Sequence, residues 1–192
     1  MRVGLLGNVG EHGSQLEAIA RFFLQIVRAE HVLYLGGDSA LTEFVARAKA
    51  SLLGTSDSTL CQRTLRCLSA SPEEIDEFLE VEDQLCRLGQ LESVPAQTVR
   101  TLHLSRGQSV AVSVHRADLS EEVSGGAGVV AFGSELLPLV KQVGPRFILC
   151  PGSLTKAGLM VLDDDDDGMR ISLFDRYGKQ IAQHALSRDA QN

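Results

Sequence analysis

The most informative segment of the chain for its fold is residues 3–38, VGLLGNVGEHGSQLEAIARFFLQIVRAEHVLYLGGD. It opens with an apolar run, residues 3–6, which predicts a buried strand. A glycine-rich turn leads to Ser14 and Glu17, whose spacing is that of a helix capping box, and apolar residues then recur at helical spacing. Residues 32–35 predict a second buried strand. A strand, a helix and a strand within about 35 residues indicate a right-handed crossover and a parallel pair.

A polar residue follows each of these two strands, Asn8 the first and Asp38 the second. The carboxyl ends of parallel strands meet at one edge of a sheet, where open α/β sheets bind ligands. We therefore expect the two loops to lie side by side. Asp38 has two possible roles there: it caps the following helix, which we expect, or it ligates a metal.

The remainder of the chain predicts helices first and strands afterwards. Helical patterns cover residues 39–53 and 71–88, and the second begins at a strong capping sequence, Ser71-Pro72-Glu73-Glu74. Strand patterns follow at residues 98–104, 109–115, 128–132, 147–150, 159–162 and 169–174. These patterns alone indicate an α/β fold with a parallel start and an antiparallel end. We expect the five aspartates at 163–167 to form a solvated hairpin loop, because they lack the spacing of a calcium loop.

The composition excludes several classes of protein. With 192 residues, 44% hydrophobic and 22% charged, the chain matches one globular domain and neither a disordered chain nor a coiled coil. No apolar run approaches the ~20 residues of a membrane span, and the start lacks a signal-peptide pattern, so we predict a cytoplasmic protein. The net charge of −7 and the scattered basic residues argue against a nucleic-acid partner. The four cysteines lack zinc-ligand spacing and are expected to be free thiols.

Five short segments lie at the ends of predicted strands. They are LLGNVG at 5–10, LYLGGD at 33–38, VAVSVH at 110–115, VVAFGSEL at 129–136 and CPGSLT at 150–155. In this order they resemble the motifs of the calcineurin-like metallophosphoesterase superfamily, in the branch of small prokaryotic phosphodiesterases and the retromer subunit of the same fold. CPGSLT is close to that family's N-P-G-S-x-[ST] turn. The resemblance covers both ends of the chain well and the middle poorly.

The resemblance implies a fold and a domain organisation. The fold is an α/β four-layer αββα sandwich of two mixed β-sheets. Residues 1–182 would form a single metallophosphoesterase-like domain with a helical insertion around 55–94, and residues 183–192 a polar C-terminal tail. The apolar side of the second helix contains Ile75, Phe78, Leu79, Leu85 and Leu88. We expect this side to cover the sheet, and the alternative is that the 55–94 segment offers a surface to a partner.

Four positions depart from the ligand pattern that the resemblance implies. Asn8 replaces the Asp of the family's D-x-H motif, and Gly10 replaces its His. Ser134 and Leu136 replace the two histidines of G-H-x-H. Family members use two metal ions, held by Asp, His and Asn, to activate water and bind a phosphate ester. An apolar side chain such as that of Leu136 cannot take part in such a site.

Only Asp38 and His115 remain as matched ligands, and residues 50–98 contain no G-N-H-D or G-N-C-D motif. Two donors cannot hold two dications, because metal affinity depends on the number and charge of the ligands. We therefore predict that the chain has no catalytic residues, no metal and no cofactor. The resemblance to the retromer subunit then implies a catalytically inactive scaffold or regulatory subunit with a protein partner.

Two alternatives remain open. One is a residual metal-dependent phosphodiesterase that binds a single divalent ion such as manganese at Asp38 and His115. Its third ligand would come from among His12, Asp57 and His103. The other is a binder of a phosphorylated small molecule, which would use the amides of Gly10 and Gly13 and the start of the first helix. A tight turn is the simpler interpretation of these glycines.

Overall fold

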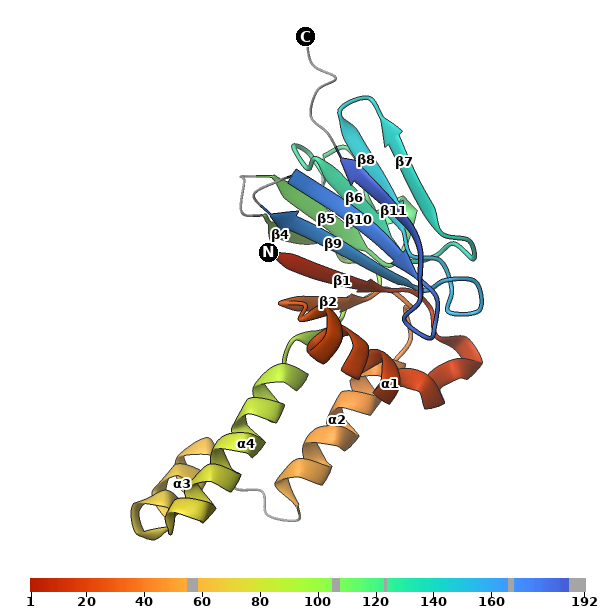
Figure 1. Cartoon of the computed structure of the whole chain (residues 1–192). Coiled ribbons are helices and arrows are strands. Elements are labelled where there is room, and N and C mark those ends of the chain that lie inside the picture. Colours follow the sequence, from red (N-terminus) through yellow and green to blue (C-terminus); the bar gives the residue numbers. More distant parts are fainter. Residues whose placement is uncertain (55–58, 105–107, 123, 166–167, 187–192) are drawn as a thin grey trace.

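The computed structural model describes residues 1–54, 59–104, 108–122, 124–165 and 168–186, which form two mixed β-sheets that face each other (Figure 1). The first sheet has the order β11-β10-β9-β1-β2-β3 and the second β4-β5-β6-β8-β7. The strands of the first are β1 (Arg2–Leu6), β2 (His31–Tyr34), β3 (Leu91–Ser93), β9 (Leu159–Asp165), β10 (Gly168–Phe174) and β11 (Gln180–Leu186). Those of the second are β4 (Arg100–His103), β5 (Ser109–Ser113), β6 (Val129–Phe132), β7 (Leu139–Val143) and β8 (Arg146–Cys150).

Helices flank the sheets, which confirms the predicted α/β sandwich. The α-helices are α1 (Leu16–Arg21), α2 (Ala40–Leu53), α3 (Leu60–Arg66) and α4 (Pro72–Leu88). The 3-10 helices are η1 (Gly10–Gln15), η3 (Cys67–Ser69) and η4 (Arg116–Asp118), and the π-helix is η2 (Phe22–Val27). Within the described residues, the crossover from β5 to β6 has only the short turn η4 as its helical layer.

The strand pair predicted from the first residues is present. β1 and β2 are parallel, from Val3 opposite His31 to Leu6 opposite Tyr34, and η1, α1 and η2 form the crossover. On its other side β1 pairs antiparallel with β9, which explains why a parallel start and an antiparallel end belong to the same sheet.

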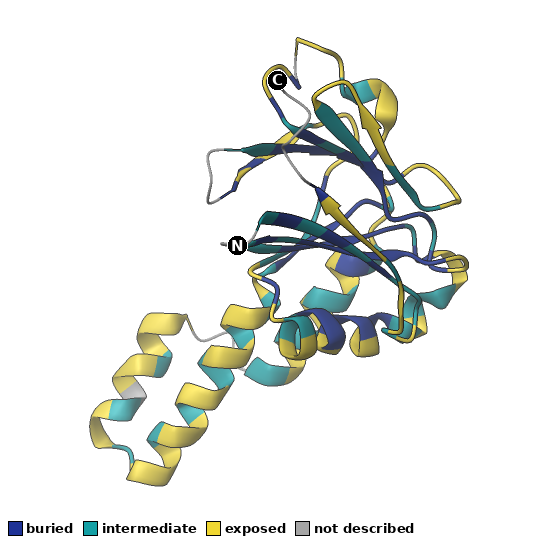
Figure 2. Cartoon of the chain, turned by 45° about the horizontal axis from the view of Figure 1, so that its top comes forward, coloured by how far each residue is buried: buried dark blue, intermediate teal, exposed yellow. Residues whose placement is uncertain are grey.

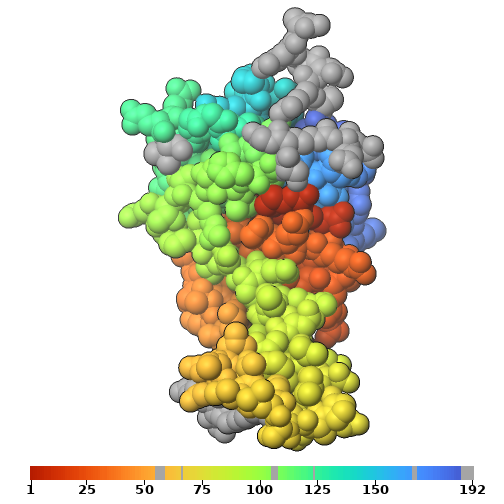
Figure 3. All heavy atoms as spheres, turned by 90° about the vertical axis from the view of Figure 1, so that its left-hand side faces the viewer, coloured from red at the N-terminus to blue at the C-terminus, as the bar shows by residue number. Residues whose placement is uncertain are grey.

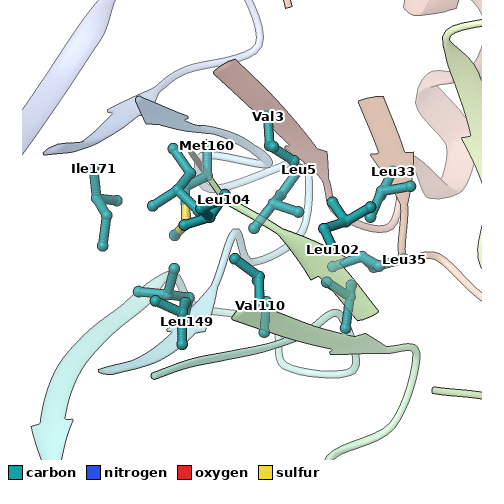
Figure 4. Close-up of a cluster of buried hydrophobic side chains, with 14 of the residues drawn as sticks. Val3, Leu5, Leu33, Leu35, Leu102, Leu104, Val110, Leu149, Met160 and Ile171 are labelled. Atoms are coloured by element: carbon teal, nitrogen blue, oxygen red, sulfur yellow. The ribbon is translucent and has the colours of Figure 1, made fainter. Parts of the chain in front are cut away.

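The main core lies between the two sheets. Figure 4 shows Val3 and Leu5 of β1 pointing toward Val110 of β5 and Leu149 of β8, and these four side chains are fully buried. A second cluster lies between the first sheet and its helices. There Phe23 packs beneath Gly4, where a Cβ atom would lie 2.6 Å from the Phe23 ring. A side chain at position 4 would therefore separate the π-helix from the sheet.

Helices α3 and α4 project from the sandwich as an arm, defined here as α3, η3 and α4 (Figures 1 and 3). No residue of α4 is buried, and Leu79 is 56% exposed (Figure 2). Leu88, at the base of the helix, is the residue of α4 that packs against the core. The expectation that the apolar side of α4 covers the sheet is therefore wrong. Instead, α4 packs beside α2 and is joined to α3 by the Arg63–Glu82 ion pair at 2.6 Å.

The aspartate run does not form a loop over its first three residues. Asp163–Asp165 belong to β9, and Asp164 is 3% exposed. Arg2 pairs with Asp163 at 2.8 Å, and Arg170 pairs with Asp165. These ion pairs allow carboxylates to continue the strand, so the loop prediction is wrong for these residues. Asp166 and Asp167 lie outside the described residues.

A further strand, β11, lies where the sequence predicted none. β11 runs to Leu186, which is 9% exposed, so residues 183–186 are part of the sheet and not of a polar tail. Residues 187–192 lie outside the described residues. In the part of the chain that the structure describes, no helix has both the length and the apolar character needed to cross a membrane.

Candidate functional site

The loops that follow β1, β2, β5, β6 and β8 meet at one end of the sandwich. The backbone amide of Leu35 donates to Leu6 at 2.8 Å, which joins the β1 and β2 ends. The amide of Gly133 donates to Val114 at 3.0 Å, which joins the β5 and β6 ends. The amide of Leu154 donates to Asn8 at 2.9 Å and connects the two sheets. The segments singled out from the sequence are therefore neighbours in space.

Two glycines allow the sheets to approach this closely. A Cβ atom on Gly7 would lie 1.7 Å from the carbonyl oxygen of Gly152, and one on Gly133 would lie 2.1 Å from that of Leu35. Both neighbours are backbone atoms, which cannot move aside as a flexible side chain can. The loop cluster is therefore fixed by direct backbone contact between the sheets.

Asn8 uses its side chain to hold two of these loops together. Its Oδ1 accepts a hydrogen bond from the Gly10 amide at 2.7 Å, and its Nδ2 donates to the Gly36 carbonyl at 3.5 Å. An amide can do both because it contains a donor and an acceptor, whereas a carboxylate only accepts. The Nδ2 donor of Asn8, which an aspartate would lack, thus helps to join the two loops.

Asp38 is engaged in a similar way. Its Oδ1 accepts hydrogen bonds from the Tyr34 hydroxyl at 2.8 Å and from the Ala40 amide at 3.0 Å, in the first turn of α2. Tyr34 is fully buried, and burial together with the Asp38 carboxylate raises the pKa of the Tyr34 phenol. Asp38 therefore lies just before Ser39, the N-cap residue of α2, and accepts from the amide of the first helical residue. Tyr34 was not singled out from the sequence, although its position four residues before Asp38 could have indicated it.

The other matched positions lie on the surface of the cluster. His115 is exposed and precedes η4 without a side-chain cap bond. Ser134 is exposed, and Leu136 is 60% exposed. Leu136 contributes to the loop cluster through its backbone, whose carbonyl accepts a hydrogen bond from the Ser153 amide at 3.0 Å.

The alternative ligands do not complete a metal site. His103 pairs with Ser109 at the beginning of β5, the opposite end of that strand from His115. His12 lies in η1, and Asp57 is outside the described residues. Within residues 1–54, 59–104, 108–122, 124–165 and 168–186, no three side chains of His, Cys, Asp or Glu lie close enough together to hold a metal ion.

The proposed anion site has one amide already occupied. The Gly10 amide donates to Asn8, so it is not free to bind a phosphate in this conformation. Gly13 lies within the 3-10 turn η1, and α1, which follows, has only six residues. The glycine series therefore forms a tight turn that leads into a short helix.

Solved structures similar to this chain belong to one fold. No protein-family profile matches the chain, and no curated protein sequence matches it. An archaeal phosphodiesterase is 14% identical with a TM-score of 0.52, and the match covers 91% of this chain and 100% of that one. A predicted phosphoesterase from Streptococcus pneumoniae is 10% identical, with a TM-score of 0.51 and coverage of 97% and 99%. A single-substitution variant of Vps29 from Entamoeba histolytica is 13% identical, with a TM-score of 0.55 and coverage of 97% and 100%.

The chain therefore has the calcineurin-like metallophosphoesterase fold, in the form shared by small prokaryotic phosphoesterases and Vps29. This confirms the resemblance that was drawn from the strand-end segments. Identities of 10–14% show the fold alone, so function rests on the residues of the site.

The two-metal centre of this fold does not fit the residues present. Asp38 and His115 are the two donors of the expected type at the matched positions, and Asp38 already accepts two hydrogen bonds. Asn8 is neutral and bonded to backbone groups, and Leu136 is apolar.

Proposed function

We propose that this chain is a catalytically inactive metallophosphoesterase-like protein that acts as an interaction scaffold or regulatory subunit. The observation that supports the proposal is the use made of Asp38, the one carboxylate at a matched ligand position. Its Oδ1 accepts from Tyr34 and Ala40 and so stabilises the start of α2. Hard dications need several anionic oxygen or imidazole ligands at one point, and the loop cluster offers too few.

The retained loop geometry has a structural explanation. The contacts between Gly7 and Gly152, and between Gly133 and Leu35, join the β-sheets through backbone atoms. Such contacts persist when the ligating side chains are replaced, because they do not involve those side chains. A fold of this kind can therefore lose its chemistry and keep its shape for binding a partner.

A scaffold role is supported by the arm. It extends away from the sandwich, and its leucines at positions 65, 68 and 79 are 58%, 82% and 56% exposed. These leucines are the candidate contact surface, because exposed apolar side chains gain free energy when a partner removes them from water. Replacing residues 59–81 by a short linker keeps Leu88 on the core, so it should leave the sandwich folded and abolish association with the partner.

A metal-binding and hydrolysis experiment tests the loss of activity. The purified chain is equilibrated with Mn²⁺, bound metal is measured by mass spectrometry, and hydrolysis of bis-p-nitrophenyl phosphate is followed. Asp38→Ala and His115→Ala are compared with Glu122→Ala, an exposed carboxylate before β6 and so at the other end of that strand. We expect no bound metal. The wild type and the three variants should hydrolyse the substrate at the same rate.

One result would reject the proposal in favour of the residual phosphodiesterase. That result is stoichiometric manganese with turnover that Asp38→Ala and His115→Ala abolish and Glu122→Ala preserves. A thermal-shift experiment with nucleotides tests the binder of a phosphorylated small molecule. Stabilisation that is lost in Gly13→Pro would favour this reading over the scaffold.

A further inference from the structure

A groove of about 880 Å³ lies at the base of the arm, between α1 with η2, α2 and α4. Its floor is apolar and includes Ala20, Leu24, Phe44, Leu52 and Leu88. Ala20 is buried and the other four are half-buried, so the floor is continuous with the core on the helix side of the first sheet. The loop cluster described above is a separate part of the molecule.

Three arginines line this groove, one from each of the surrounding helices. Arg21 pairs with Glu17 at 3.6 Å, and Arg87 pairs with Asp83 at 2.9 Å. Arg47 has no ion pair among the described residues. Both existing pairs are exposed, and exposed pairs contribute about 0–1 kcal/mol, so incoming carboxylates can replace them. With Arg21, Arg47 and Arg87 against Glu17 and Asp83, the lining has one excess positive charge in a chain whose net charge is −7.

The far end of the arm has the opposite character. Residues 71–81 contain five acidic side chains and no basic one. Glu74 closes the capping box with Ser71. The other four are exposed and have no ion pair among the described residues; they are Glu73, Asp76, Glu77 and Glu80. Leu68, in the turn η3 that precedes α4, is 82% exposed.

The acidic end and the groove lie along one face of α4. Positions 73, 77, 80, 84 and 87 are separated alternately by four and three residues, the spacing of side chains on one helix face. Glu73, Glu77 and Glu80 occupy the outer part of this row, while Gln84 and Arg87 line the groove. The separation from position 73 to 87 corresponds to about 21 Å along the helix. One face of α4 therefore runs from an acidic outer end to a basic groove with an apolar floor.

We propose that this surface binds a second copy of the chain as a two-fold dimer with antiparallel arms. In that arrangement the outer end of each α4 lies in the groove of the other copy. Glu77 and Glu80 pair with Arg47 and Arg21, and the exposed leucines at the tip face the apolar floor. A two-fold interface must be self-complementary, and a face with opposite charge at its two ends meets this condition only when the partner is reversed. The inference does not depend on whether the loop cluster binds a metal.

Charge-reversal variants test the dimer. The groove variant combines Arg21→Glu with Arg47→Glu, and the tip variant combines Glu77→Arg with Glu80→Arg. All four residues are exposed, so the fold should be unaffected, which circular dichroism checks. Lys141→Glu, on the exposed part of β7, is the control for a change in net charge. Association is measured by sedimentation equilibrium from about 1 to about 100 µM, the range in which a micromolar dissociation constant becomes visible.

We expect a concentration-dependent dimer for the wild type and for Lys141→Glu. Each of the two double variants should weaken the dimer about tenfold or more, since two attractive pairs become repulsive at each end. An equimolar mixture of the groove and tip variants should restore a heterodimer, detected by native mass spectrometry, because both of its junctions pair opposite charges. A monomeric wild type over this range overturns the proposal, even if the groove binds an acidic peptide from another protein. Equal dimerisation of wild type and both variants also overturns it.

Discussion

Replacing Tyr34 with phenylalanine tests whether Asp38 is held in a structural role. Tyr34 is fully buried, and its hydroxyl donates to Oδ1 of Asp38 at 2.8 Å. Tyr34→Phe removes one oxygen and creates almost no cavity, so the loss is confined to this hydrogen bond. Asp38 is exposed, so its Oδ1 keeps the Ala40 amide and recovers a water molecule.

The expected destabilisation can be estimated from the loss of this hydrogen bond. A hydrogen bond to a charged group contributes about 1.5–3 kcal/mol, and the exposure of Asp38 favours the lower part of that range. We therefore expect Tyr34→Phe to lower the free energy of unfolding by about 2 kcal/mol. In a chain of this size that corresponds to a decrease of about 6 °C in Tm. With an m-value of about 2.5 kcal/mol/M, the urea midpoint should fall by about 0.8 M.

The assay is urea unfolding followed by circular dichroism, with Tyr177→Phe as the matched control. Tyr177 is 74% exposed and bonded to the neighbouring Arg176, so its hydroxyl should contribute almost nothing. A double-mutant cycle with Asp38→Ala should give a coupling energy of about 1 kcal/mol. If Tyr34→Phe matches Tyr177→Phe, or if the cycle is additive, Asp38 is not held by Tyr34 and its carboxylate is free to bind a metal.

Four further predictions concern the loop cluster and the thiols. Asn8→Asp should cost about 1 kcal/mol, because the donor to Gly36 is lost, and Mn²⁺ should not raise its Tm in differential scanning fluorimetry; a stabilising effect of Mn²⁺ would contradict this. The pKa of Tyr34 is raised in the folded state, so this group should not affect the free energy of unfolding below pH ~10. Above that pH the free energy of unfolding should fall by up to about 1.4 kcal/mol per pH unit, and the fall should be smaller in Tyr34→Phe. Gly152→Ala should cost about 2 kcal/mol or more, because φ is +74° and the new Cβ would lie 2.7 Å from the Pro138 nitrogen; Gly126→Ala, with a similar φ and open space, should cost about 1 kcal/mol by the same urea assay. In thiol titration with Ellman's reagent, exposed Cys61 and Cys86 should react at once, whereas buried Cys150, whose pKa burial raises, should react only after unfolding.

The strands predicted correctly were those with buried apolar runs. β1, β2, β6 and β8 each contain such a run, because both faces of a central strand are covered and periodicity is not needed to find it. β3, β7 and β11 were missed, and each is an edge strand. β7 and β11 have mostly exposed or half-exposed residues, so their position depends on pairing with a neighbour and leaves little hydrophobic pattern in the sequence.

For helix α4 the sequence predicted the element but not the surface against which it packs. Its capping box at Ser71 was predicted and is present, with Glu74 reaching back to the Ser71 amide at 2.7 Å. Its amphipathic period was also correct, but a period states only that one face is less polar than the other. It does not say whether that face meets a sheet or another helix, and here it meets α2 and α3.

The candidate site could be located from the sequence but its bonding could not. Strand order brought Asn8 and Asp38 to one edge, as expected for parallel strands. The partners that define their roles are Tyr34 and the backbone of Gly36, Gly10 and Ala40. Backbone groups contribute at every position and have no signature in the residue type, so only coordinates could assign these hydrogen bonds.

The loop cluster and the arm differ in how they tolerate substitution, and this difference bears on function. At the loop cluster the backbone approaches so closely that Gly7, Gly133 and Gly152 cannot be replaced without moving a strand end. The ligating side chains, in contrast, are free to change, because the sheets are joined without them. On the arm no side chain of α4 is buried. Apart from the capping box at Ser71, the Arg63–Glu82 ion pair and Leu88 at the core, its positions tolerate exchange for other helix-forming residues. Glu77 and Glu80 lie beyond the first turn, where the helix dipole no longer favours an acidic side chain, so folding does not require them and association through the arm is the more direct physical reason for their pattern.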